Sequence, residues 1–284
     1  MFSGKRVSLQ SFRLIGENSF LTLLLVVSSR QNAGVPFVSQ PDDAEAVGES
    51  ASRFEHEALA VVLQVRGRKL HSLLWQRAQE PFAQHWALPG GALSSTERLG
   101  SSLGRHLATK VDLTDIGFLE QLETRSDVGR DPRGRVIATA YIALVSTDLN
   151  PTIPRDTAWF PVDDLPPTAF DHASIIRSGR ERLRAKLTYT NVAYALVPVT
   201  FTIAELRVVY EACLGHAISS TNLQRVLLRR KIIESTESVA LPSSSGGRPA
   251  TLYRFSERTL RVTDPFAAFR PPAGDVDQRH EARS

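Results

Sequence analysis

Basic, amide and hydroxyl side chains are concentrated in one short segment in the last quarter of the chain, from Ser220 to Lys231. This segment has four basic residues and no acidic one. Cationic side chains bind DNA phosphates, and polar groups in the first turns of a helix can read base edges in the major groove. The predicted DNA contacts are Ser220, Thr221, Asn222, Gln224, Arg225, Arg229, Arg230 and Lys231, together with Arg248 and Arg254 further along the chain. Taken alone, the segment is equally compatible with a basic helix that simply faces solvent.

The residues before this segment predict two helices joined by a tight turn. Thr202 and Glu205 have the spacing of a capping box, which starts a helix. Gly215 is suited to end that helix. After a short turn, Ser219 or Ser220 can cap a second helix. This arrangement is typical of a helix-turn-helix.

A β-hairpin is predicted after the second helix. Strand patterns at residues 238–241 and 250–255 lie on either side of a tip rich in serine and glycine. Two helices followed by such a wing favour a DNA-binding domain over residues 191–262 rather than a merely solvated basic helix.

A second pattern lies in the middle of the chain and starts at a glycine pair. After Gly91, the residues Glu97, Arg105 and Leu107 follow at the spacing of the Nudix box, so this segment resembles the signature of that hydrolase family. The segment departs from the signature where the family has its remaining glutamates and its late glycine, at His106, Thr109, Lys110 and Asp112.

The departures from the Nudix signature concern its chemistry. Nudix enzymes use these carboxylates to hold magnesium, a hard cation that requires oxygen ligands and bridges substrate phosphates. The hydroxyl of Thr109 and the ammonium of Lys110 cannot replace them. The resemblance therefore implies a Nudix fold with a degenerate box, and we expect no catalytic residue, no metal and no cofactor.

Apolar patterns between residues 53 and 190 agree with a layered domain of strands and helices. The predicted strands are 59–65, 70–76, 118–125, 136–145, which is expected to be central, and 156–162. Helices are predicted over 95–110, where Leu99, Leu103 and Leu107 share one face, and from Asp171 to about Leu187. The expected fold class is α/β (α+β), a Nudix-fold sandwich followed by a C-terminal winged helix-turn-helix domain.

The order of the two domains and several short motifs make the chain similar to the Nudix-related transcriptional regulators of the NrtR family. The similarity covers about residues 55–258, and its motifs are 81–91, 130–134, 159–166, 170–173, 201–206, 209–212 and 246–250. The resemblance implies a homodimeric repressor of NAD biosynthesis and salvage genes that binds double-stranded operator DNA. It also implies ADP-ribose or a related nucleotide as the effector.

A Nudix-like domain that binds ADP-ribose needs donors for a diphosphate and a surface for adenine. Arginine side chains can make forked contacts with phosphate oxygens, and a glycine backbone can approach them closely. The candidate ligand residues are Arg77, Trp86, Gly90, Gly91, Glu97, Arg105, Arg130 and Arg133.

Several residues of this domain have an alternative structural interpretation. Trp86 could belong to the core, and Glu97 could be a carboxylate at a helix start. Arg105 could simply pair with Glu97. Lys110 is expected to face solvent at a helix end rather than a phosphate, and His172 is expected to be packed or hydrogen-bonded rather than a general base.

Composition limits the remaining choices. The 284-residue chain has a formal net charge of +4, which permits a nucleic-acid partner without requiring one. Its single cysteine, Cys213, is expected to pack in the core, and it favours a reducing cytoplasm. The apolar run at 20–27 is far shorter than the roughly 20 residues that span a bilayer. Residues 1–52 and 263–284 are expected to be a disordered leader and tail.

Three classes of function stay open at this point. A ligand-responsive transcriptional repressor is favoured. An active ADP-ribose hydrolase with a regulatory tail would need a metal site, which Glu97 and Glu120 could form in a weaker version. A protein-interaction module would use the winged helix against another protein.

Overall fold

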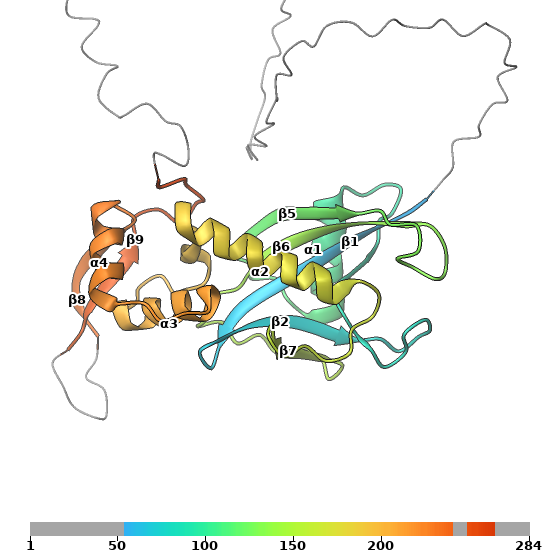
Figure 1. Cartoon of the computed structure of the whole chain (residues 1–284), viewed down its shortest axis with the longest axis horizontal. Helices are drawn as coiled ribbons and strands as arrows, with labels where there is room; N and C mark the ends of the chain where they lie inside the picture. The colour runs from blue at the N-terminus through green and yellow to red at the C-terminus, as the bar shows by residue number, and fades with distance from the viewer. Residues whose placement is uncertain (1–53, 241–248, 265–284) are drawn as a thin grey trace, which may run out of the picture. The chain divides into compact units, whose positions relative to one another are not determined.

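The computed structural model describes residues 54–240 and 249–264. The expected leader, Arg248, and the expected tail from residue 265 lie outside the described residues. In the described part, a domain with a large mixed sheet precedes a smaller domain of two helices and a β-hairpin (Figure 1). No helix in these ranges is long and apolar enough to cross a membrane.

The first domain contains one seven-stranded sheet in which β1 is central. The strand order is β3-β2-β1-β6-β5, with β4 and β7 pairing with β1 and β2 off this path. The strands are β1 (Glu55–Arg66), β2 (Lys69–Gln76), β3 (Trp86–Ala87), β4 (Gly90–Ala92), β5 (Phe118–Arg125), β6 (Val136–Leu144) and β7 (Thr157–Pro161). β1 pairs in parallel with β6 and antiparallel with β2 and β4. Strands that are covered on both faces are mostly apolar, as residues 58–63 of β1 and most of β6 are.

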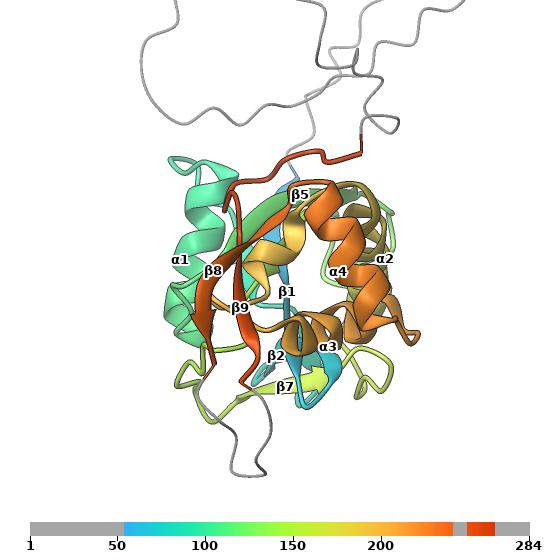
Figure 2. The ribbon, with the colours of Figure 1, turned by 90° about the vertical axis from the view of Figure 1, so that its left-hand side faces the viewer.

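Helices α1 (Leu99–Val111) and α2 (His172–Tyr189) cover opposite faces of this sheet (Figure 2). Successive side chains of β1 point to alternate faces. Val62 accordingly packs in one core with Leu107 of α1, and Val61 packs in the other with Ile175 of α2. Burial of each such side chain stabilises the fold by about 1.5–3 kcal/mol.

The second domain has the predicted order of two helices and a hairpin. Its elements are the short 3-10 helix η1 (Val192–Ala195), α3 (Ile203–Leu214), α4 (Ser220–Arg229), β8 (Ile233–Val239) and β9 (Thr251–Phe255). Phe201 is buried and contacts the ring of Phe255, with centroids 5.3 Å apart. Cys213 is also fully buried, as predicted, and burial raises the pKa of its thiol to about 12.

The predicted helix caps are confirmed. The hydroxyl of Thr202 accepts a hydrogen bond from the Glu205 N–H, and the Glu205 carboxylate accepts one from the Thr202 N–H. Gly215 ends α3 with a left-handed φ of 78°. Of the two candidate serines, Ser219 is the N-cap of α4, because its hydroxyl accepts from the Asn222 N–H.

Several element boundaries differ from the predictions. α1 begins at Leu99 rather than at residue 95, and the first hairpin strand begins at Ile233 rather than at 238. α4 ends at Arg229, so Arg230 and Lys231 lie beyond its helical turns. β3 and β4 have only two and three residues, which is too short for a periodic pattern to reveal them.

Candidate functional site: a pocket in the Nudix-like domain and a basic helix

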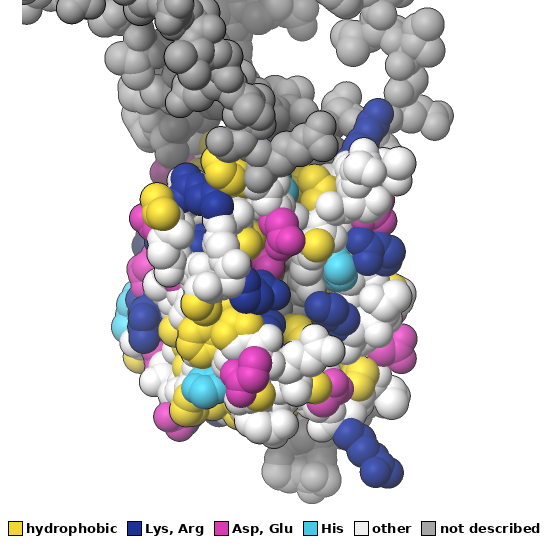
Figure 3. Space-filling model, turned by 90° about the vertical axis from the view of Figure 1, so that its right-hand side faces the viewer, with side chains coloured by type: hydrophobic (Ala, Val, Ile, Leu, Met, Phe, Trp, Pro, Cys, Tyr) yellow, Lys and Arg dark blue, Asp and Glu magenta, His cyan; other side chains and the backbone are white. Residues whose placement is uncertain are grey.

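A pocket of about 440 Å³ opens at the end of the sheet where β1 begins and β2 ends. Figure 3 views the molecule from this end and shows basic, acidic and hydrophobic side chains next to one another. The residues that line the pocket and bear on its chemistry are Glu55, Glu57, Trp75, Arg77, Gly90, Gly91, Lys110, Arg133, Phe170 and His172. Four of the eight predicted ligand residues are in this set. The pocket therefore combines donors for an anionic group with aromatic surface.

Gly90 and Gly91 are required by the close approach of neighbouring elements. A Cβ atom on Gly90 would lie 2.2 Å from the backbone oxygen of Ala58, and one on Gly91 would lie 2.8 Å from the ring of His106. Both glycines pair with β1 through β4. Their lack of side chains therefore lets β4 pack tightly beside β1 and leaves their backbone open to the pocket.

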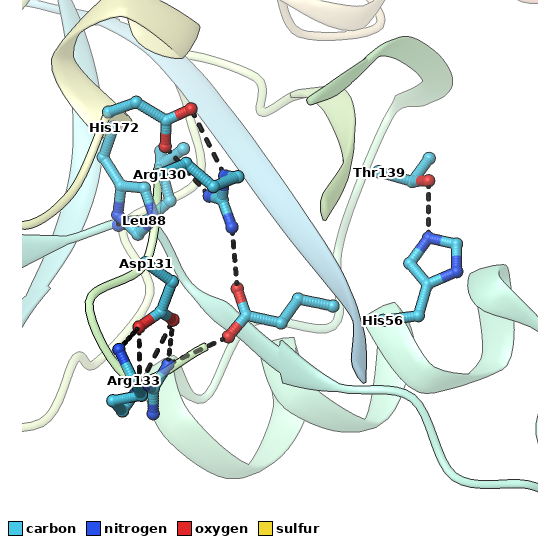
Figure 4. Close-up of polar contacts among 9 residues, drawn as sticks. His56, Leu88, Arg130, Asp131, Arg133, Thr139 and His172 are labelled. Atoms are coloured by element: carbon cyan, nitrogen blue, oxygen red, sulfur yellow. Dashed lines mark hydrogen bonds and ion pairs between the residues drawn. The ribbon is translucent and has the colours of Figure 1, made fainter. Parts of the chain in front are cut away.

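Arg130 is a buried member of an ion-pair network rather than a free cation. Its side chain is 2% exposed, and its Nη2 atom is 2.9 Å from a carboxylate oxygen of Asp171. Its Nη1 atom is 3.8 Å from the Glu57 carboxylate (Figure 4). Burial is the largest influence on Glu57 and raises the pKa of its carboxyl, although Arg130 and Arg133 act in the opposite direction.

Arg133 and Arg77 both line the pocket and both lie close to the same aromatic ring. The guanidinium carbons of Arg77 and Arg133 are 4.9 Å and 5.5 Å from the centroid of Phe170. Arg133 also binds Asp131, with its Nε atom 3.0 Å from a carboxylate oxygen. The Arg77 Nε donates to the Pro81 carbonyl at 3.0 Å. Phe170 has a φ of 51°, an uncommon value for a bulky residue, and it presents an aromatic surface that sequence reasoning did not identify.

His172 is a buried, neutral side chain in the wall of the pocket, and it accepts a hydrogen bond from the backbone. Its Nδ1 atom accepts from the Leu88 N–H at 3.0 Å, so the proton of the neutral ring is on Nε2. Burial lowers the pKa of His172 to about 3. Its Nε2 atom has no hydrogen-bond partner among the described residues. The expectation of a buried, hydrogen-bonded histidine is confirmed.

Besides the buried Arg130, three more predicted ligand residues are not among those that line the pocket. Trp86 packs against Phe160, with ring centroids 4.6 Å apart, which matches its interpretation as a core residue. Arg105 and Glu97 bind each other, with the Arg105 Nε and Nη2 atoms each 2.7 Å from a carboxylate oxygen. This bond lowers the pKa of the Glu97 carboxyl to about 2. None of these three residues lines the pocket.

The expected solvent-facing role of Lys110 is wrong. Its side chain is partly buried in the pocket wall, with Nζ 2.6 Å from the Gly90 carbonyl oxygen and 4.4 Å from the centroid of the Trp75 ring. A sequence signal for this position exists. Lys110 follows Leu107 by three residues, which places it at the edge of the apolar face of α1.

The pocket residues do not fit the magnesium ion that a Nudix hydrolase would hold. The Glu57 carboxylate is bound by two arginines, and Lys110 contributes an ammonium at a position where the family has a carboxylate. In the part of the chain that the structure describes, no three His, Cys, Asp or Glu side chains are grouped to hold a metal ion.

The proposed weaker metal site does not form either. Glu97 is bound to Arg105 of α1, whereas Glu120 on β5 is bound to Arg182 and Lys186 of α2. The two helices lie on opposite faces of the sheet, so these carboxylates are not brought together.

The basic segment lies on α4, and its residues are not equally free. Thr221, Asn222, Arg225 and Arg229 are exposed. The Arg225 guanidinium donates to the Asn222 side-chain oxygen at 2.8 Å, which joins two predicted DNA contacts one turn apart. Ser220 is the first residue of the helix and is only partly exposed.

The remaining predicted DNA contacts have partners within the protein or lie outside α4. The Gln224 amide donates to the Tyr253 hydroxyl at 2.8 Å, and Arg230 donates to the Thr188 carbonyl at 3.1 Å. Arg254 on β9 pairs with Glu234 on β8 at 2.7 Å. Lys231 is exposed just after the helix, and Arg248 lies outside the described residues.

Comparison with known proteins places both domains. Residues 55–178 match the family described as NUDIX domain, and residues 193–255 match the family described as NrtR DNA-binding winged helix domain. The chain is 34% identical over 200 residues to the "ADPR responsive transcriptional repressor NtrR" of Acinetobacter baylyi, covering 66% of this chain and 76% of that protein.

Solved structures agree with this assignment. The chain is similar to Shewanella oneidensis NrtR in complex with a 27mer DNA, with 31% identity, a TM-score of 0.61, and coverage of 70% of this chain and 93% of that one. It is also similar to a MutT/nudix family protein from Enterococcus faecalis, with 25% identity, a TM-score of 0.59, and coverage of 73% and 90%. With a Nudix domain followed by a winged helix, and with this degree of identity to a named repressor, the chain belongs to the NrtR family of Nudix-related transcriptional regulators.

Proposed function

We propose that this chain is a transcriptional repressor that binds double-stranded operator DNA through α4 and the β8–β9 hairpin. The observation that carries the proposal is the exposed set of polar and basic side chains on α4, at the position of a recognition helix. Arg225 and Asn222 are the proposed base-reading pair, and Arg229 is the proposed phosphate contact. We place the protein in the cytoplasm, with its DNA.

The Nudix-like domain acts in this proposal as a sensor of ADP-ribose or a related nucleotide. Support comes from the pocket of arginine, lysine and aromatic side chains, and from the relative that is named an ADPR-responsive repressor. The domain is not a hydrolase in this proposal, because Thr109 and Lys110 stand where a Nudix enzyme has metal-binding glutamates. Control of NAD biosynthesis and salvage genes, and action as a homodimer, follow from the family resemblance.

A gel-shift experiment tests the proposal as a whole. The full chain is incubated with DNA duplexes, with and without ADP-ribose. The duplexes are taken from upstream of the protein's own gene and of genes for NAD biosynthesis and salvage. We expect retardation of a duplex that contains a palindrome with half-sites about 10 base pairs, or a multiple of that, apart. ADP-ribose is expected to weaken this complex. Lack of retardation above that of an unrelated duplex would contradict DNA recognition.

A hydrolase remains the alternative function, since the chain is 31% identical over 107 residues to an ADP-ribose pyrophosphatase from Methanocaldococcus jannaschii, covering 63% of that enzyme. Release of AMP from ADP-ribose by the purified chain, abolished by EDTA, would establish this alternative. We expect no release above that of a buffer control.

A further inference from the structure

We infer that the Lys110 ammonium is a built-in cation that binds the diphosphate of the nucleotide ligand, so that ligand binding needs no metal ion. This inference rests on the proposed sensing of a nucleotide by the same pocket. It assigns a role to a residue that stands where the Nudix signature has a metal-binding glutamate.

The position of the Lys110 ammonium is fixed by two groups. The Gly90 carbonyl accepts a hydrogen bond from Nζ at 2.6 Å, and the face of the Trp75 ring lies 4.4 Å away. The Trp75 ring is itself held, because its Nε1 donates to the Leu88 carbonyl at 3.0 Å. An ammonium has three N–H donors. Among the described residues it uses one of them in a hydrogen bond, which leaves donors for a ligand in the pocket.

The charges of the pocket match a diphosphate. Arg130 and Arg133 are neutralised by Asp171, Asp131 and Glu57. Lys110 and Arg77, in contrast, have no carboxylate within 4 Å in the described part of the chain, and both line the pocket. The diphosphate that bridges the two ribose units of ADP-ribose carries two negative charges. The two unneutralised cations can therefore be paired by one such group.

A partly buried cation without an ion-pair partner is unfavourable in the free protein. Burial lowers the pKa of the Lys110 ammonium, which reflects this cost. An anionic ligand offsets this unfavourable free energy, because it brings a negative charge next to the ammonium. A magnesium ion would increase it by repulsion, and would find the Glu57 carboxylate already bound by two arginines.

Isothermal titration of the full chain with ADP-ribose tests the inference, with one buffer containing EDTA and another containing magnesium. For the natural chain we expect dissociation constants that agree within about twofold in the two buffers. Lys110→Met should weaken binding about tenfold or more, because it removes a charge-assisted hydrogen bond to the ligand. Lys110→Arg keeps the charge and should bind more tightly than Lys110→Met.

The control is Lys69→Met, which removes an exposed lysine at the other end of β2 and should leave binding unchanged. Thermal unfolding checks that each variant is folded, and Lys110→Gln replaces Lys110→Met if the latter is not. The inference would be overturned if the folded neutral variant bound ADP-ribose as tightly as the natural chain does. It would also be overturned if the natural chain no longer bound ADP-ribose in the buffer with EDTA. Absence of any ADP-ribose binding by the natural chain in both buffers would instead refute the proposed sensing function.

Discussion

His172 shows how one buried side chain can make stability depend on pH. Its ring is neutral in the folded protein because burial lowers its pKa from 6.5 to about 3. The unfolded chain therefore binds a proton near pH 6.5 that the folded chain does not bind until about pH 3. Stability contributed by this group is fully present above pH 6.5 and is lost as the pH falls below that value.

We expect the free energy of unfolding to fall by about 1.4 kcal/mol between pH 7.5 and pH 5.5 through this residue, since one pKa unit corresponds to about 1.4 kcal/mol. His172→Asn should remove this part of the pH dependence while keeping an acceptor for the Leu88 N–H. Urea unfolding at the two pH values measures it. His216→Asn, at an exposed position, is the matched control. Its free energy of unfolding should change with pH as much as that of the natural chain does. If the free energy of unfolding changes equally with pH in all three proteins, His172 is not the source of this pH dependence.

At the same scale, the sequence predicted the types of residue in the pocket better than which individual residues line it. Gly90, Gly91 and Arg133 could be placed because the Nudix pattern and charge are visible in the sequence. Trp86 was ambiguous in the sequence, since an aromatic side chain can serve a ligand or a core equally well; in the structure it packs against Phe160. Phe170 and Lys110 enter the pocket through a left-handed backbone and a helix orientation, which depend on tertiary contacts.

Among the elements, α4 carries the proposed DNA specificity, and its two exposed arginines should behave differently. Arg225 is in the second turn and is held by Asn222, so it is positioned to read a base. Arg229 is in the last turn and suits a phosphate. We expect Arg225→Ala to weaken operator binding about tenfold or more and binding to unrelated DNA much less. Arg229→Ala should weaken both to a similar degree.

Fluorescence anisotropy with the operator and a scrambled duplex, over a series of salt concentrations, separates these effects. Removal of a phosphate contact should reduce the slope of log affinity against log salt by about one. Arg98→Ala is the matched control, because Arg98 is an exposed arginine at the start of α1, in the other domain. Equal losses on both duplexes for Arg225→Ala would contradict its role in base reading.

Most elements were predictable because they carry caps or strong periodicity. The Thr202 and Glu205 box, Gly215 and Ser219 placed both ends of α3 and the start of α4 to within a residue. The parallel pairing of β1 with β6 was not predictable, since a local pattern does not reveal which distant strand lies alongside. The end of α4 at Arg229 was also missed, because the basic run continues past the helix.

At the scale of the whole molecule, β1 and β2 connect the ligand pocket with the DNA-binding domain. Glu57 at one end of β1 lies in the pocket, and the hairpin that follows Arg66 lies against α3. There Arg68 is 3.7 Å from the Glu211 carboxylate, which also pairs with Arg207 at 3.8 Å. β1 and this hairpin thus lie between the pocket and α3, and Glu211 is the charged contact at the α3 end.

We expect Glu211→Gln to reduce the effect of ADP-ribose on DNA binding, because coupling requires a contact that differs between the two states. The glutamine keeps an acceptor for the Ile218 N–H and removes only the charge. Since Arg68 is 68% exposed, and exposed ion pairs contribute about 0–1 kcal/mol, the ratio of DNA affinities with and without ADP-ribose should fall by no more than about fivefold. Titrations of each ligand alone should be nearly unchanged. If the variant keeps the ratio of DNA affinities of the natural chain, the two sites are coupled through other contacts. Helix α2, which packs against α3, is then the next candidate.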